Sequence, residues 1–240
     1  MSVLVVGSVA LDSVETPFGK AEDVIGGSAT YFSASASHQT PVQLVGIVGG
    51  DYPIEKLQPL TARGVDLAGL ERADGESFRW RGRYLPNMND RETLEVHLNV
   101  LEQFRPKLND THRDCRFLFL GNASPVVQLD VLEQAKGAVL TVADTMDLWI
   151  NIQRDELGQL LRRIDGLVLN GGALTPEAMR ATSAKPMRLS VPATENWPAA
   201  NARSASAASS MCAAMRLALA SILSRALEIA VMPTAPEREP

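Results

Sequence analysis

The chain of 240 residues contains only two cysteines, Cys115 and Cys212, which lie far apart and fit no metal-binding spacing. Its three histidines, His38, His97 and His112, also lack the mutual spacing of a metal site. We therefore expect no metal site of this kind, and the low cysteine content favours a reducing compartment.

Long apolar runs are also absent. No stretch reaches the roughly 18 apolar residues of a membrane-spanning helix, and residues 1–7 have no basic region and too short an apolar run for a signal peptide. The net charge of −5 gives no reason to expect nucleic acid or an anionic membrane as a partner. We expect a soluble, cytoplasmic protein without nucleic-acid or membrane partners.

Two nucleotide-binding motifs are missing as well. No Gly-Lys-Ser/Thr occurs, which excludes a P-loop, and Gly7 is not followed by the Gly-x-x-Gly of a Rossmann dinucleotide site.

Short apolar segments alternate with helical patterns over the first 170 residues. This alternation is typical of a parallel sheet flanked by helices, and an apolar fraction of 45% is enough for a real core. The expected strands are residues 3–6, 42–48, 117–120, 140–143 and 167–169, and the expected helices are 28–38, 54–63, 126–135 and 148–163. Two regions, about 12–25 and 77–98, interrupt this rhythm with alternating patterns, and together they predict a small separate β layer.

Three motifs are ambiguous when each is taken alone. Asp12 follows the first strand and either caps a turn or lies at the ligand-binding edge of a sheet. Gly26-Gly27 precedes a helix, where a tight turn is commoner than a ligand loop, and residues 46–51 are a strand end with a turn.

In their order along the chain these motifs are more specific. The series Gly7 to Asp12, Ile25 to Thr30 and Leu44 to Asp51 resembles the N-terminal signature of ribokinase-like (PfkB-type) carbohydrate kinases. Residues 64–66 are similar to the family's step into its lid strands, and residues 121–122, 143–146 and 167–170 to its sheet-edge loops. The resemblance covers about residues 3–170, and it implies a three-layer αβα fold with a mostly parallel sheet and a small β-sheet lid.

The resemblance implies a sugar or nucleoside substrate. Asp12 would bind substrate hydroxyls, while Gly26 and Gly27 would let the backbone approach the sugar, and Asn122 also falls in the substrate region. Arg81, Arg83 and Thr93 lie in the lid, where we favour an exposed face for all three. ATP and Mg²⁺ would be the cofactors, with Asn170 in the phosphate and metal region, and a homodimer through the lid is a further expectation.

The sequence departs from the family after Asn170. Ala173 stands where the family's Asn-x-x-Glu motif has its Glu. No Gly follows Gly172 and no Asp follows Asp165, so the family's glycine-rich anion hole and its aspartate base have no counterpart there. We expect residues 171–240 to be an Ala/Ser/Arg-rich tail, poorly structured or helical, with 204–229 as the best helix former.

Three interpretations stay open at this point. The chain is a sugar kinase whose C-terminal part is lost or read in a shifted frame, a non-catalytic sugar-binding or interaction protein derived from such a kinase, or a gene remnant. In each of them this chain is catalytically incomplete.

Overall fold

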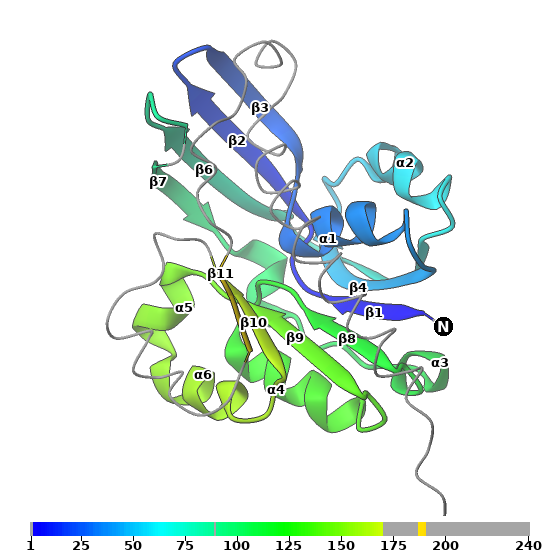
Figure 1. Cartoon of the computed structure of the whole chain (residues 1–240). Coiled ribbons are helices and arrows are strands. Elements are labelled where there is room, and N and C mark those ends of the chain that lie inside the picture. Colours follow the sequence, from blue (N-terminus) through cyan, green and yellow to red (C-terminus); the bar gives the residue numbers. More distant parts are fainter. Residues whose placement is uncertain (1, 89, 170–186, 191–240) are drawn as a thin grey trace, which may run out of the picture.

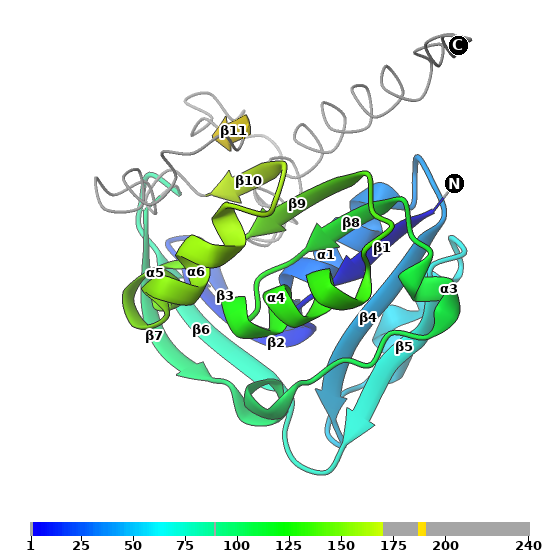
Figure 2. The same ribbon diagram turned by 90° about the horizontal axis from the view of Figure 1, so that it is seen from below.

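The computed structural model describes residues 2–88, 90–169 and 187–190. Its centre is a seven-stranded sheet in which every neighbouring pair is parallel, in the order β11-β10-β9-β8-β1-β4-β5 (Figures 1 and 2). The strands are β1 Val3–Val6, β4 Val42–Gly49, β5 Asp66–Ala73, β8 Phe117–Leu120, β9 Leu140–Asp144, β10 Gly166–Leu169 and β11 Met187–Ser190.

Helices cover both faces of this sheet, which explains why its central strands are continuous apolar runs. Successive side chains of a strand point to opposite faces. Accordingly Val3 and Val5 of β1 pack into one core cluster, while Leu4 and Val6 pack into the other. The helical segments are α1 Ser28–Ala36, η1 Ile54–Leu57, α2 Gln58–Thr61, η2 Asn99–Gln103, α3 Asp110–Arg113, α4 Pro125–Gln134, α5 Asp147–Ile152 and α6 Arg154–Leu161.

A second sheet of four strands forms a lid beside the carboxyl ends of the central strands (Figure 1). Its order is β3-β2-β6-β7, with β2 parallel to β6 and the other pairs antiparallel. These observations confirm the predicted three-layer architecture with a small β lid. The strands are β2 Ala10–Thr16, β3 Gly19–Gly26, β6 Phe78–Tyr84 and β7 Arg91–His97.

The two faces of the lid differ in character. Trp80 and Val96 pack against the core cluster, so the face that carries them is the inner one. Arg79, Arg81 and Arg83 alternate with Trp80 along β6 and therefore lie on the outer face.

Two expected helices are each divided. The helix expected over 148–163 is split at Gln153, whose backbone is not helical (φ −133°, ψ 47°) and whose side-chain oxygen accepts a hydrogen bond from Ser124 Oγ at 2.6 Å. The helix expected over 54–63 consists of η1 followed by α2, which has a proline in its first turn. No described helix is both long and apolar enough to cross a membrane.

Two expectations about sheet membership were wrong. Residues 64–66 do not lead into the lid, because β5 begins at Asp66 and pairs in parallel with β4 at the edge of the central sheet. Within 171–240, residues 187–190 form β11 and pair with β10, although we expected this range to be helical or irregular. A strand of four residues can add to a free sheet edge without a strong sequence signal of its own. The expected helix over 204–229 lies outside the described residues.

Candidate functional site

The lid joins the body at the carboxyl end of β1, where Ser8 organises the junction. The chain passes from β1 through Ser8 into β2 and returns from β3 through Gly27 into α1. Ser8 Oγ accepts a hydrogen bond from the Ser28 backbone N–H at 3.1 Å, and the Ser8 carbonyl accepts one from the Ala29 N–H at 3.1 Å. These N–H groups at the start of α1 are therefore already used within the protein.

Asp12 lies on β2 where the lid meets the body, and its carboxylate is directed toward Gly26 of the neighbouring strand. A Cβ added at Gly26 would lie 2.2 Å from the Asp12 carboxyl carbon. Burial raises the pKa of Asp12 from 3.8 to about 7. The side chain is half-buried, so it combines a strong hydrogen-bond acceptor with access to a ligand.

In the structure, glycine is needed at positions 26 and 27 because of contacts within the protein, whereas we expected it to allow a sugar to approach the backbone. Gly26 leaves room for the Asp12 carboxylate. Gly27 has φ +96°, and a Cβ there would lie 2.3 Å from the Ser8 carbonyl oxygen. Both glycines are thus required by the protein's own contacts, before any approach of a sugar to the backbone is considered.

Asn122 follows β8, and both its backbone and its side chain make hydrogen bonds within the protein. Its backbone N–H donates to Ser28 Oγ at 2.6 Å, and its side-chain oxygen accepts from Trp149 Nε1 at 2.9 Å. Its side-chain nitrogen contacts Met146 Sδ at 2.9 Å. These contacts tie the loop after β8 to α1 and α5, so a role of Asn122 in substrate binding stays a prediction.

A second carboxylate, that of Asp144 at the end of β9, belongs to the same region, although the sequence analysis did not select it. Burial raises the pKa of Asp144 to about 7, while the Thr145 backbone N–H and the charge of Arg91 act in the opposite direction. Arg91 acts on both Asp144 and Tyr84, and the charge of Asp12 also reaches Tyr84. Burial raises the pKa of Tyr84, the charge of Arg91 lowers it, and that of Asp12 raises it further.

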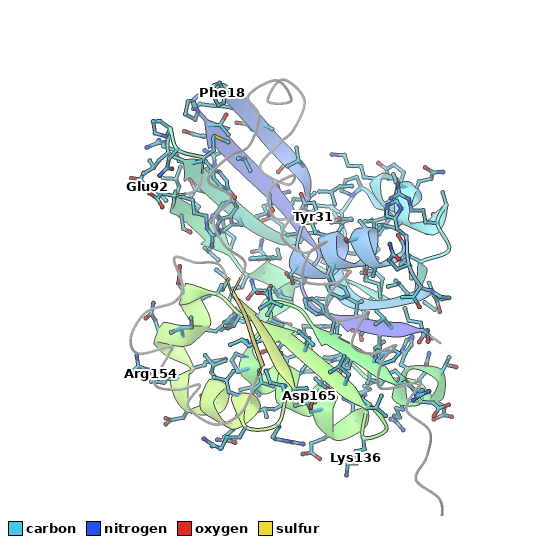
Figure 3. The ribbon with its side chains drawn as sticks, viewed as in Figure 1. Phe18, Tyr31, Glu92, Lys136, Arg154 and Asp165 are labelled. Carbon is cyan, nitrogen blue, oxygen red and sulfur yellow. The ribbon has the colours of Figure 1, made fainter. Side chains whose placement is uncertain are left out.

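Two buried hydroxyls accompany these carboxylates. Tyr52 Oη, whose pKa is raised by burial and by the charges of Asp12 and Tyr31, has no hydrogen-bond partner among the described residues. Thr145 Oγ1, next to Asp144, also lacks one there. Nearby, Tyr31 donates its hydroxyl to the Ile25 carbonyl at 2.6 Å (Figure 3).

The sequence analysis missed the lid residues Trp80, Tyr84 and Arg91. For Trp80 and Tyr84 a partial signal existed, because alternation places positions 80, 82 and 84 on one face of a strand. The pairing of Asp12 with Trp80, which puts Asp12 on the same face, is known only from the structure.

Of the lid residues considered from the sequence, two face away from this site. Arg81 and Arg83 lie on the outer face, where they pair with Glu22, Glu15 and Glu92. Thr93 lies on the inner face and accepts a hydrogen bond from Trp80 Nε1 at 3.3 Å. Asn170 lies outside the described residues.

The donor set of the described residues does not include a metal site. No group of three or more His, Cys, Asp or Glu side chains suited to a metal ion occurs among them. We therefore assign none of these residues to Mg²⁺.

Comparison with known proteins gives matches in structure but not in sequence. No family model and no curated protein matches the sequence. The *Methanocaldococcus jannaschii* nucleoside kinase, an archaeal member of the ribokinase family, superposes with a TM-score of 0.56 and 16% identity over 75% of this chain. The chain has the ribokinase fold.

Two further structures share this fold. *Arabidopsis thaliana* ribokinase, solved with ribose and ATP, matches 79% of this chain at 15% identity and a TM-score of 0.58. An uncharacterized sugar kinase from *Pyrococcus horikoshii* also matches 79% of it, at 13% identity and a TM-score of 0.61. This chain spans 63% of the nucleoside kinase, 71% of the *Arabidopsis* ribokinase and 73% of the *Pyrococcus* kinase. It therefore has the core and lid of the ribokinase fold and is shorter than these relatives.

Proposed function

We propose that this chain derives from a cytoplasmic sugar kinase that transfers a phosphoryl group from ATP to a hydroxyl of a sugar or nucleoside. The observation that carries the proposal is the half-buried Asp12 carboxylate, which lies under a β lid at the carboxyl edge of a parallel sheet. Ligands of open α/β sheets bind at this edge. The ribose and ATP of the *Arabidopsis* ribokinase structure agree with the proposed substrate and nucleotide.

In this proposal Asp12 accepts hydrogen bonds from substrate hydroxyls, and the lid excludes water around them. A carboxylate that is desolvated within the protein gains more from a hydroxyl donor than one that is already bonded to the protein. Asp144 provides a second acceptor at the end of β9.

ATP would supply the phosphoryl group, and Mg²⁺ would neutralise its charge during transfer. We do not assign the groups that hold them to any described residue. The sequence beyond Gly172 contains no glycine or aspartate from which an anion hole and a general base of the family's type would be built. This chain would therefore bind the sugar without turning it over at a useful rate.

The alternative is a binding or interaction protein that has kept the Asp12 site and lost the chemistry by selection. It predicts the same sugar binding, so the two proposals differ in whether a complete kinase is encoded at this locus.

The experiment is a ligand-induced thermal shift with a panel of sugars and nucleosides, followed by calorimetric titration of the best ligand. Asp12→Asn should weaken that binding roughly 10-fold or more, because it replaces a charge-assisted hydrogen bond by a neutral one. Arg83→Gln on the outer face of the lid is the control and should leave the affinity unchanged. If no sugar or nucleoside binds, the proposed function is wrong.

A further inference from the structure

The lid carries four arginines, and three of them have carboxylate partners on its outer face. Arg79 pairs with Asp23 and Asp51, and Arg81 with Glu22 at 3.9 Å. The third, Arg83, pairs with Glu15 at 3.2 Å and with Glu92 at 3.6 Å. These pairs hold neighbouring lid strands together or tie the lid to the body.

Arg91 differs from the other three because it lies on the inner face. Its position opposite Tyr84 in the antiparallel pair of β6 and β7 places both side chains on the same face. Its guanidinium carbon lies 5.9 Å from the centroid of the Trp80 ring, and Trp80 packs against the core. Within the part of the chain that the structure describes, no carboxylate oxygen comes within 4.0 Å of it.

The ring beneath Arg91 is firmly placed. A Cβ at Gly82 would lie 2.0 Å from the Trp80 ring, so the indole covers the backbone at that glycine. The indole Nε1 of Trp80 donates a hydrogen bond to Thr93 Oγ1 at 3.3 Å. A guanidinium above a fixed aromatic ring loses less freedom when it binds a ligand, which favours a specific contact.

The surroundings of Arg91 suggest what it binds. A hydrogen bond from Arg91 and the charge of Arg91 both lower the pKa of the Tyr84 hydroxyl. The same charge also lowers the pKa of Asp144. Asp12 and Asp144 offer acceptors suited to hydroxyl groups, whereas the planar fork of an arginine suits the paired oxygens of a carboxylate or a phosphate. The inner face thus combines acceptors for a polyol with a cation for an oxyanion.

We propose that Arg91 is a specificity-determining residue that binds an anionic oxygen group, a carboxylate or a phosphate ester, on a polyhydroxylated substrate. This inference rests on the proposed function, since it names the substrate class of the Asp12 site. The carboxylate or phosphate would lie against Arg91 and Tyr84, and the hydroxyls would lie toward Asp12.

The test compares matched ligands that differ in one charged group. Calorimetric titration of the full chain would use glucuronate with glucose, gluconate with glucitol, and ribose phosphate with ribose. The first two pairs test a carboxylate and the third a phosphate ester. We expect one anionic ligand to bind roughly 10- to 100-fold more tightly than its neutral partner, with a preference that falls as salt rises.

Three variants assign that preference to Arg91. Arg91→Gln should remove it, Arg91→Lys should keep part of it because the charge remains, and Arg81→Gln on the outer face should keep all of it. Arg91→Lys also covers the case in which Arg91→Gln does not fold. If the neutral ligand of each pair binds as tightly as the anionic one, the inference fails and the proposed function stands. If no member of any pair binds, the inference fails, and the wider panel of sugars and nucleosides decides the proposed function.

Discussion

At the scale of single residues, Asp12 links the site to the stability of the fold. Its pKa is raised to about 7 in the folded chain, whereas it is near 3.8 in an unfolded one. Between these values the folded state holds more protons than the unfolded state, so stability falls as pH rises from about 4 to 7. The fold therefore tolerates an ionised Asp12 at a cost, as expected of a group kept for binding.

Asp12→Asn should remove this cost. We expect the variant to be more stable than the wild type at pH 8 by roughly 2–4 kcal/mol, and about equally stable near pH 4. Denaturant unfolding at the two pH values measures the difference. The remaining pH dependence of the variant should reflect Asp144, whose pKa is raised in the same way. Equal stability of the two proteins at pH 8 would contradict the environment described for Asp12.

Gly27 should be among the least replaceable residues of the chain. In Gly27→Ala a Cβ would meet the Ser8 carbonyl oxygen at 2.3 Å, with the backbone at φ +96°. Gly64 is the matched control, because it has φ +78° and nothing within 4 Å of an added Cβ. Gly64→Ala should cost only the backbone strain, about 1 kcal/mol, whereas Gly27→Ala should cost at least about 3 kcal/mol. Similar losses in the free energy of unfolding would show that the contact with Ser8 is unimportant.

At the scale of elements, Asp51 ties the lid to the central sheet. It accepts hydrogen bonds from the Ser77 backbone N–H at 2.8 Å and from Ser77 Oγ at 2.7 Å, and it pairs with Arg79 at 2.7 Å. Burial alone would raise the pKa of Asp51, but the bonds from Ser77 and Arg79 outweigh it and lower the pKa. This carboxylate lies between the end of β4 and the start of β6.

Asp51→Asn should therefore destabilise the chain at neutral pH by about 1–3 kcal/mol. Because the folded pKa of Asp51 is lowered, its contribution is present above the unfolded pKa of about 4 and is lost as pH falls through the folded value. Hydrogen exchange should speed up first in β6 and β3. The exposed pair of Glu22 with Arg81, at 3.9 Å, is the control, and Glu22→Gln should change stability by less than about 0.5 kcal/mol. If Asp51→Asn changes stability as little as Glu22→Gln does, Asp51 does not tie the lid to the central sheet.

The buried strands were predictable from the sequence, because runs such as residues 3–6 and 42–48 stay apolar only between two helical layers. Their order in the sheet was not predicted. The lid was predictable from its alternating pattern. β5 was not, since its burial is mixed and its place follows from pairing with β4 rather than from its own residues. The place of Asp12 beside Gly26 at the base of the lid was predictable from its motif, and its role in binding stays a prediction. The place of Arg91 was not predictable, because only the register with Tyr84 decides which face it occupies.

At the scale of the whole molecule, the outer face of the lid is the expected surface for a homodimer. Arg81 and Arg83 alternate there with acidic side chains, and Phe18 at the tip of the β2–β3 hairpin is 70% exposed (Figure 3). A hollow in this face is lined by residues that include Ser13, Glu22, Asp23, Arg79, Arg81, Glu95 and His97.

A dimer formed through such a face would depend on charge pairs that salt screens. Sedimentation velocity should therefore detect more dimer at about 0.05 M salt than at about 0.5 M salt. Arg81→Glu should weaken the dimer, whereas Lys136→Glu, far from the lid, should not (Figure 3). A chain that is monomeric at every concentration and both salt levels would exclude this interface.

The last prediction concerns how the sequence after Asn170 arose, and it can be decided without a structure. Glycine and aspartate end together at Gly172 and Asp165, although turns between strands and helices depend on them. Alanine, arginine, serine and proline replace them, as in GC-rich DNA that is read out of register. Only residues 231–234, Val-Met-Pro-Thr, resemble the first half of the family's Asp-Pro-Thr-Gly-Ala-Gly-Asp motif, and Ala-Pro-Glu-Arg follows them. We predict that another frame of the gene encodes a Gly-Ala-Gly-Asp-like motif near or beyond position 234.

Restoring that frame should return the general base and the anion hole, each of which contributes roughly 10²- to 10⁴-fold to such a transfer. The restored chain should then phosphorylate the sugar that this chain is proposed to bind. The pairing of β11 with β10 does not oppose this, because four residues can extend a parallel edge whatever their origin. Sequencing the gene decides the question: if neither alternative frame encodes the motif, residues 171–240 are an authentic segment, and the binding protein becomes the better proposal.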